Sequence, residues 1–197
     1  MSQEPIQLAV IIGSVRAGRF GPAVTQWFAG QTRDHSAVTV DVIDLEQYPL
    51  PLRMPDFGEE PPVEVAPVKN ALGERLQRAD AYVVVTPEYN HAPPAALKNA
   101  IDWYRSEWAA KPVGLISYGG LSGGLRAAEH LRQIFAELHA MTVRDAVSFH
   151  HAWNDFTHEG EPSSPEGSEA AAKVLLDQLV WWGVALRDAR RARPYNV

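Results

Sequence analysis

The first loop suited to holding a charged ligand runs from Gly13 to Phe20. Ser14 offers a hydroxyl there, and Arg16 and Arg19 offer planar forks of N–H donors. The next helix has Gly21 as its expected N-cap, so its unpaired N–H groups and positive dipole end face the loop. This array suits a phosphate monoester, which carries roughly −1.5 to −2 charges at pH 7. Unless the arginines are merely solvated, the predicted phosphate site comprises Ser14, Arg16, Arg19, Phe20 and Gly21.

A second loop, Thr86–Pro94, follows the apolar run Tyr82–Val85 and carries an aromatic side chain. A proline near its start fixes the turn and removes one backbone donor. The next three residues keep free N–H groups that can bond the polar edge of a flat ring. Tyr89 can pack beside such a ring, and its alternative role is a surface anchor at a subunit contact. The predicted wall of the site is Pro87, Glu88, Tyr89 and Asn90.

The third loop, Ser117–Gly124, supports two opposed interpretations. It contains Gly-x-Ser-x-Gly between a strand and a helix, which is the context of a hydrolase nucleophile elbow at Ser122. A serine hydrolase would then need Asp145 or Asp155, followed by His158. In the other interpretation the glycines let the backbone approach a ring, and Ser122 caps the next helix. On that interpretation the contributing residues are Ser117, Tyr118, Gly119, Gly120 and Ser122.

The three loops together resemble the signature of the NAD(P)H-dependent FMN reductases of the flavodoxin-like superfamily, which include quinone, azo-dye and chromate reductases. The matching stretches are Gly13–Phe20, Thr86–Trp103 and Tyr118–Gly124, and the resemblance runs from about residue 6 to 148. The first loop is neither a Gly-x-Gly-x-x-Gly dinucleotide fingerprint nor a Walker sequence. FMN ends in a phosphate monoester, as the first loop requires, whereas FAD and NAD do not.

The resemblance implies bound FMN, NADPH or NADH as co-substrate, and a small acceptor such as free flavin or a quinone. It names no catalytic acid or base in this chain. It also implies a homodimer or homotetramer with the flavin near a subunit boundary, where Trp103 and Trp108 are the expected interface residues. An FMN-binding electron carrier or sensor without nicotinamide turnover is the second hypothesis, and composition does not choose between the two.

Five strand-like runs alternate with helical segments, which predicts one flavodoxin-like α/β domain over residues 1–197. The first, third and fourth runs are almost continuously apolar, whereas the second and fifth alternate, as strands at sheet edges do. This pattern predicts a parallel sheet of order 2-1-3-4-5 with helices on both faces. Ligands of such sheets bind beyond the carboxyl ends of strands one and three, where the first two loops lie. The runs are 6–12, 38–43, 81–85, 112–118 and 141–149.

The helical segments are separated by two long polar stretches. The stretch 44–62 is expected to be an extended loop, and 150–167 a mobile surface loop. The last helix is expected to bury Val174, Leu175, Trp181, Trp182 and Leu186 in some combination. The predicted helices cover 21–30, 64–78, 95–108, 122–139 and 168–191.

Composition excludes several classes of protein. The 197 residues include no cysteine, so any redox chemistry needs a bound cofactor. A formal charge of −6 disfavours nucleic acid as a partner. Met1–Pro5 carries neither a basic nor a long apolar stretch, which favours a cytoplasmic protein without a membrane partner. The histidines at 150, 151 and 158 match no familiar ligand spacing, so no metal site is expected.

Overall fold

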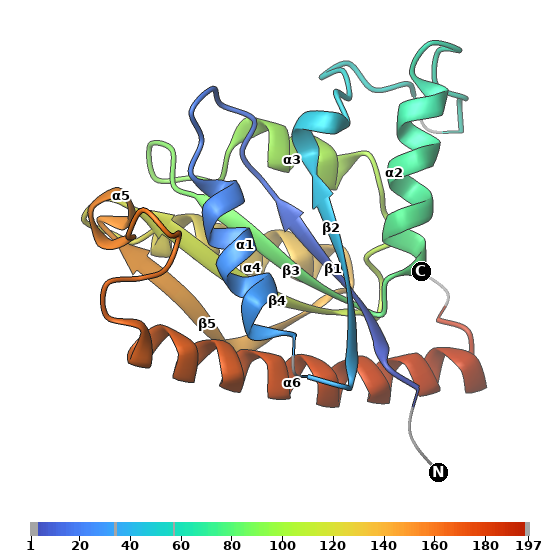
Figure 1. Ribbon diagram of the computed structural model, residues 1–197. Coiled ribbons are helices and arrows are strands. Elements are labelled where there is room, and N and C mark those ends of the chain that lie inside the picture. The colour runs from blue at the N-terminus through green and yellow to red at the C-terminus, as the bar shows by residue number, and fades with distance from the viewer. Residues whose placement is uncertain (1–3, 34, 57, 196–197) are drawn as a thin grey trace.

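The computed structural model describes residues 4–33, 35–56 and 58–195, and it forms one five-stranded sheet (Figure 1). The sheet order is β2-β1-β3-β4-β5 and every neighbouring pair is parallel, which confirms the predicted topology. The winding reverses between β1 and β3, so this pair forms the switch point of the sheet. The strands are β1 (Ile6–Ile12), β2 (Val38–Asp44), β3 (Ala81–Pro87), β4 (Pro112–Gly119) and β5 (Met141–His150).

Burial of the strands follows their place in the sheet. Every residue of β3 and β4 is buried, and Gln7 is the single exposed residue of β1. The edge strands β2 and β5 contain exposed and half-buried residues. The apolar runs of the sequence therefore mark the strands that are covered on both faces, as parallel sheets require.

Helices cover the sheet in two layers (Figure 1). On one face, α1 (Gly21–Gln31) and α6 (Pro165–Ala192) pack on alternate residues of β1, β3 and β4. On the other face lie α2 (Ala66–Arg78), α3 (Ala95–Asp102) and α4 (Leu125–Glu137). In the described part of the chain, no helix is long and apolar enough to cross a membrane.

The helix α3 ends six residues earlier than expected, and this changes the role of two tryptophans. Residues beyond Asp102 form turns, in which Trp103 Nε1 donates to Pro51 O at 3.0 Å and Trp108 Nε1 to Ile101 O at 3.1 Å. Trp103 is 8% exposed and Trp108 is 2% exposed. Both belong to the core, so the expectation that they form a subunit interface was wrong.

Other helices begin a few residues away from their predicted first residues. The helix α4 begins at Leu125, and α6 begins at Pro165. A 3₁₀ helix, η1 (Leu45–Gln47), follows β2. The polar stretch after β5 contains a short helix, α5 (Ala152–Asp155), and a bridge between Phe156 and Pro162. In α6, Leu175 is buried, whereas Val174, Trp181 and Trp182 are exposed, so the tryptophans do not join the core.

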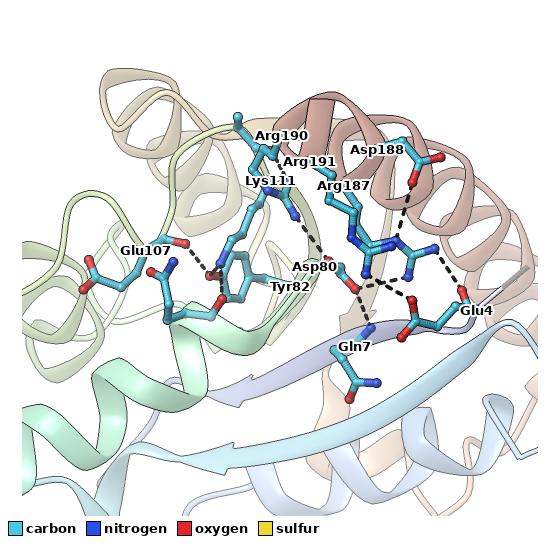
Figure 2. A network of polar contacts seen from close by, with 12 residues as sticks. Glu4, Gln7, Asp80, Tyr82, Glu107, Lys111, Arg187, Asp188, Arg190 and Arg191 are labelled. Atoms are coloured by element: carbon cyan, nitrogen blue, oxygen red, sulfur yellow. Dashed lines mark hydrogen bonds and ion pairs between the residues drawn. The ribbon is translucent and has the colours of Figure 1, made fainter. Parts of the chain in front are cut away.

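An ionic network fastens α6 to the amino ends of the strands (Figure 2). Asp80, which precedes β3, accepts hydrogen bonds from Arg187 at 3.4 Å and Arg190 at 3.2 Å. The same carboxylate accepts the backbone N–H of Gln7 at 3.1 Å. The network lies at the end of the sheet opposite the three polar loops, so it anchors the scaffold without touching them.

Candidate cofactor site

Three loops meet at the carboxyl ends of β1, β3 and β4. The backbone N–H of Gly13 donates to Val85 O at 2.9 Å, and that of Glu88 donates to Tyr118 O at 3.3 Å. The hydroxyls of Ser14 and Tyr118 share a hydrogen bond of 3.1 Å, and both side chains are buried. Each loop is thus tied to a neighbour, and the predicted residues of all three are brought together.

The first loop forms a cradle of backbone donors. None of the N–H groups from Val15 to Gly18 has an acceptor within residues 4–33, 35–56 and 58–195, and all four residues are exposed. Arg16 lies among them and makes no ion pair with any described residue. Four successive N–H groups beside one cation can bind an anion, because runs of neighbouring backbone donors form anion-binding concavities.

The helix α1 begins beside this cradle. Its N-cap is Phe20, where Gly21 was expected, and no side chain caps it. Gly21 is instead required by close packing, since a Cβ there would stand 2.8 Å from Ser14 Oγ and 3.0 Å from the Tyr118 hydroxyl. The uncapped end leaves the positive pole of α1 facing the first loop.

Arg19 is already engaged with carboxylates, which corrects its expected role. Its guanidinium donates to Asp44 at 2.5 and 2.6 Å, to Glu46 at 2.6 Å and to Ser14 O at 2.7 Å. The hydrogen bond with Asp44 raises the pKa of Arg19, although burial opposes the change. Arg19 therefore fixes the shape of the loop, and Arg16 is left as its free cation. The sequence did not indicate this pairing, because Asp44 and Glu46 are distant along the chain.

The second loop is a tight turn that uses one of its three expected donors internally. The backbone N–H of Tyr89 donates to Ala92 O at 2.9 Å, and that of Ala92 returns a bond to Tyr89 O at 3.1 Å. Between them, Asn90 (φ 50°) and His91 (φ 73°) are left-handed. The N–H of Glu88 is bonded to β4, so Asn90 alone of these three residues keeps an N–H without an acceptor in the part of the chain that the structure describes.

Glu88 clamps the second loop to the start of α4. Its carboxylate accepts the Arg126 backbone N–H at 3.1 Å and guanidinium at 2.9 Å, and it also bonds the Ser122 hydroxyl. Burial alone would raise the pKa of Glu88, but these hydrogen bonds outweigh it and lower the pKa. Glu88 is therefore an ionised, positioned group at neutral pH.

The position of Ser122 removes two of its expected roles. The N-cap of α4 is Gly124 and receives no side-chain bond, so Ser122 is not the cap. Ser122 bonds Glu88, and no histidine among the described residues hydrogen-bonds it. Asp145 is bound to Gln178, and His158 is exposed. No hydrolase triad is assembled in this part of the chain.

The glycines of the third loop are required by its backbone. Gly123 (φ 60°) and Gly124 (φ 82°) are left-handed, and a Cβ on Gly124 would stand 2.8 Å from Tyr118 N. Ser117 Oγ and Ser148 Oγ both donate to Gly123 O, at 2.8 and 2.9 Å. The loop is consequently held in one shape. Gly119 and Gly120 lead into it directly from β4.

The segment after β5 borders the site, although the sequence suggested only a polar loop. The backbone N–H of His151 donates to Gly120 O at 3.0 Å, which ties α5 to the third loop. Phe156 packs edge-on against Phe20 at a centroid distance of 5.0 Å, and Phe20 packs against Tyr118 at 5.9 Å. The aromatic residues within this otherwise polar stretch were the available signal.

Burial raises the pKa of Tyr118 to about 12, while hydrogen bonds from Ser14 and Gly21 oppose the rise. The Tyr118 hydroxyl is thus neutral at pH 7 and serves to join the first and third loops.

A sheet of this order, with an anion cradle after β1 and loop walls after β3 and β4, defines a flavodoxin-like protein with a mononucleotide-type site. The chain matches the family model described as NADPH-dependent FMN reductase over residues 6–154. It belongs to this family and is an oxidoreductase that uses FMN, with NAD(P)H as co-substrate.

Known relatives span different shares of the chain. An NAD(P)H-dependent FMN reductase of Schizosaccharomyces pombe is 34% identical over 125 residues, which are 60% of this chain and 60% of that protein. A probable NADPH:quinone oxidoreductase of Oryza sativa is 34% identical over 181 residues, 87% of this chain and 89% of that one. The flavoenzyme NAD(P)H:(acceptor) oxidoreductase of Paracoccus denitrificans has a TM-score of 0.70 at 20% identity, covering 90% of this chain and 97% of that chain, and supports the fold.

Proposed function

We propose that the three loops hold FMN and that the chain passes electrons from NADPH or NADH to a quinone-type acceptor. The observation that carries this proposal is the cradle of free N–H groups at the switch point of the sheet, beside Arg16. Bound FMN would supply the redox chemistry, taking a hydride from the nicotinamide and giving two electrons to the acceptor. The balance is quinone + NAD(P)H + H⁺ → hydroquinone + NAD(P)⁺.

The first loop binds the phosphate group in this proposal. The N–H groups of Val15 to Gly18 and the guanidinium of Arg16 are its ligands, and the amino end of α1 adds its dipole. Ser14 and Arg19 act as positioning residues, since their polar groups are used by Tyr118 and Asp44. Phe20 and Gly21 form the packed base beneath the loop.

The second and third loops form the walls for the flavin ring. Asn90 contributes a free backbone donor, and Tyr89 contributes an aromatic face. Glu88 keeps these loops together, because its carboxylate accepts two hydrogen bonds from Arg126 at the start of α4, and Ser122 lies beside it. The remaining residues proposed to line this region are Pro87, Ser117, Tyr118, Gly119 and Gly120.

No side chain in this region is proposed as a catalytic acid or base. The lowered pKa of Glu88 leaves it ionised, and the raised pKa of Tyr118 leaves it neutral near pH 7. The chain binds and orients the reactants, and the proton that completes hydroquinone formation is supplied by water.

The localisation, oligomeric state and partners of the enzyme are also part of the proposal. The family resemblance supports a cytoplasmic homodimer or homotetramer. The formal charge of −6 argues against nucleic acid as a partner.

The test is FMN titration of the apoprotein followed by anaerobic addition of NADPH. Arg16→Ala is expected to weaken FMN binding about ten- to a hundredfold, because it removes a charged hydrogen bond to the phosphate. Arg33→Ala, an exposed arginine just beyond α1, is the control and should leave the affinity unchanged. Wild-type protein that binds FMN but is not reduced by NADPH would instead support an electron carrier. Failure to bind FMN would refute the proposal.

A further inference from the structure

Trp153 is an exposed tryptophan at the edge of the candidate cofactor site. It lies on α5, and 58% of its surface is exposed. Within the described residues its indole makes no ring contact and no hydrogen bond. An aromatic face left in water at the rim of a ligand site is available to stack on a flat ligand.

The backbone around Trp153 is fixed against the third loop. His150 Nδ1 lies 2.9 Å from Leu121 O, and the N–H of His151 donates to Gly120 O at 3.0 Å. A Cβ on Gly120 would stand 3.8 Å from two ring atoms of the indole. The indole therefore rests on the part of the loop that follows β4 directly. The helix that carries it, α5, lies at the left of Figure 1.

The same segment reaches the first loop on its other side. Phe156 packs against Phe20 at 5.0 Å, three residues beyond Trp153. Residues 150–156 thus run between the loops after β4 and β1, and they hold the indole in place without covering it. Leu121, next to Gly120, is 81% exposed and adds apolar surface to the same rim.

We propose that Trp153 is a specificity-determining residue that stacks on planar aromatic acceptors of the quinone class. This inference rests on the proposed function, because the acceptor must reach the same three loops. A flat apolar ring gains from the indole face, whereas a small hydrated anion does not. A quinone acceptor takes two electrons and two protons, whereas two ferricyanide ions take one electron each. In both cases NADPH supplies the two electrons.

The experiment compares two acceptors with one enzyme at saturating NADPH. For Trp153→Ala, we expect the KM for menadione to rise about three- to tenfold, as loss of an aromatic pair implies, with kcat/KM for ferricyanide unchanged within twofold. Trp153→Phe should restore most of the menadione affinity. Trp181→Ala is the matched control, since Trp181 on α6 is 64% exposed and remote from the loops.

The outcomes separate this inference from the proposed function. An unchanged KM for menadione in Trp153→Ala, or an equal loss with both acceptors, would overturn the role of Trp153 while leaving the enzyme a reductase. A wild-type protein that reduces neither acceptor from NADPH would refute the proposed function itself. FMN affinity of Trp153→Ala, measured in parallel, is expected to match that of the wild type.

Discussion

Replacing Lys111 by methionine should change how stability depends on pH. Lys111 precedes β4 and is 3% exposed, and its Nζ donates to the carbonyls of Leu76 at 2.9 Å and Gln77 at 3.0 Å. The Nζ also lies 3.1 Å from the Tyr82 hydroxyl (Figure 2). Burial, with a smaller contribution from Arg190, lowers the pKa of Lys111 to about 7 from 10.5.

The sign follows from proton binding. Between pH 7 and 10.5 the unfolded chain keeps the Lys111 proton and the folded chain releases it, so wild-type stability rises with pH in this window. A pKa depression of about 3.5 units corresponds to at most about 5 kcal/mol, or up to about 1.4 kcal/mol per pH unit. Hydrogen bonds from the ammonium to the two carbonyls favour the charged form and so limit the depression of the pKa.

The assay is urea unfolding of wild type and Lys111→Met at several pH values from 7 to 10. The free energy of unfolding of the wild type, relative to the variant, should rise by about 1 kcal/mol per pH unit. Lys98→Met is the control, because Lys98 is an exposed lysine in an i,i+4 pair with Asp102. A difference between wild type and Lys111→Met that does not vary with pH would show that the buried ammonium stays charged, and would refute the reasoning.

Two further substitutions test the loops. Arg19→Met should lower the free energy of unfolding by about 1 to 2 kcal/mol and also weaken FMN binding, because Asp44 loses its bidentate partner and the first loop loses its shape; an unchanged urea midpoint would contradict this. Gly124→Ala should destabilise by about 1 to 3 kcal/mol, since φ is 82° and the new Cβ would meet Tyr118 N at 2.8 Å. Its control is Gly167→Ala, where a Cβ meets nothing within 4 Å and a loss of stability is not expected.

The topology was predictable because a strand that is buried on both faces of the sheet has an almost continuously apolar sequence. Residues 81–85 are apolar throughout, and 112–118 are apolar apart from Ser117. These runs are the central strands β3 and β4. The edge strands alternate because water reaches them. The order of the sheet then places the first two loops at one end, which needs no knowledge of side-chain contacts.

The partners of the polar side chains were not predictable, because they come from distant parts of the chain. The sequence predicted that Arg19 binds a phosphate, but in the fold its guanidinium pairs with Asp44 and Glu46. Ser122 looked like a helix cap or a nucleophile, yet it bonds Glu88 from another loop. Trp103 and Trp108 looked like interface residues because α3 was extended too far, and the turns after Asp102 bury them.

The most direct measurement compares the affinities of the apoprotein for FMN and for riboflavin, which shares the ring but lacks the phosphate. If the free N–H groups of Val15 to Gly18 and the Arg16 guanidinium bind the phosphate, FMN should bind at least about a hundredfold more tightly than riboflavin. Arg16→Ala should then reduce the ratio of the two affinities. Equal affinities for the two flavins in the wild-type protein would contradict the assignment of the first loop and, with it, the cofactor site proposed for this chain.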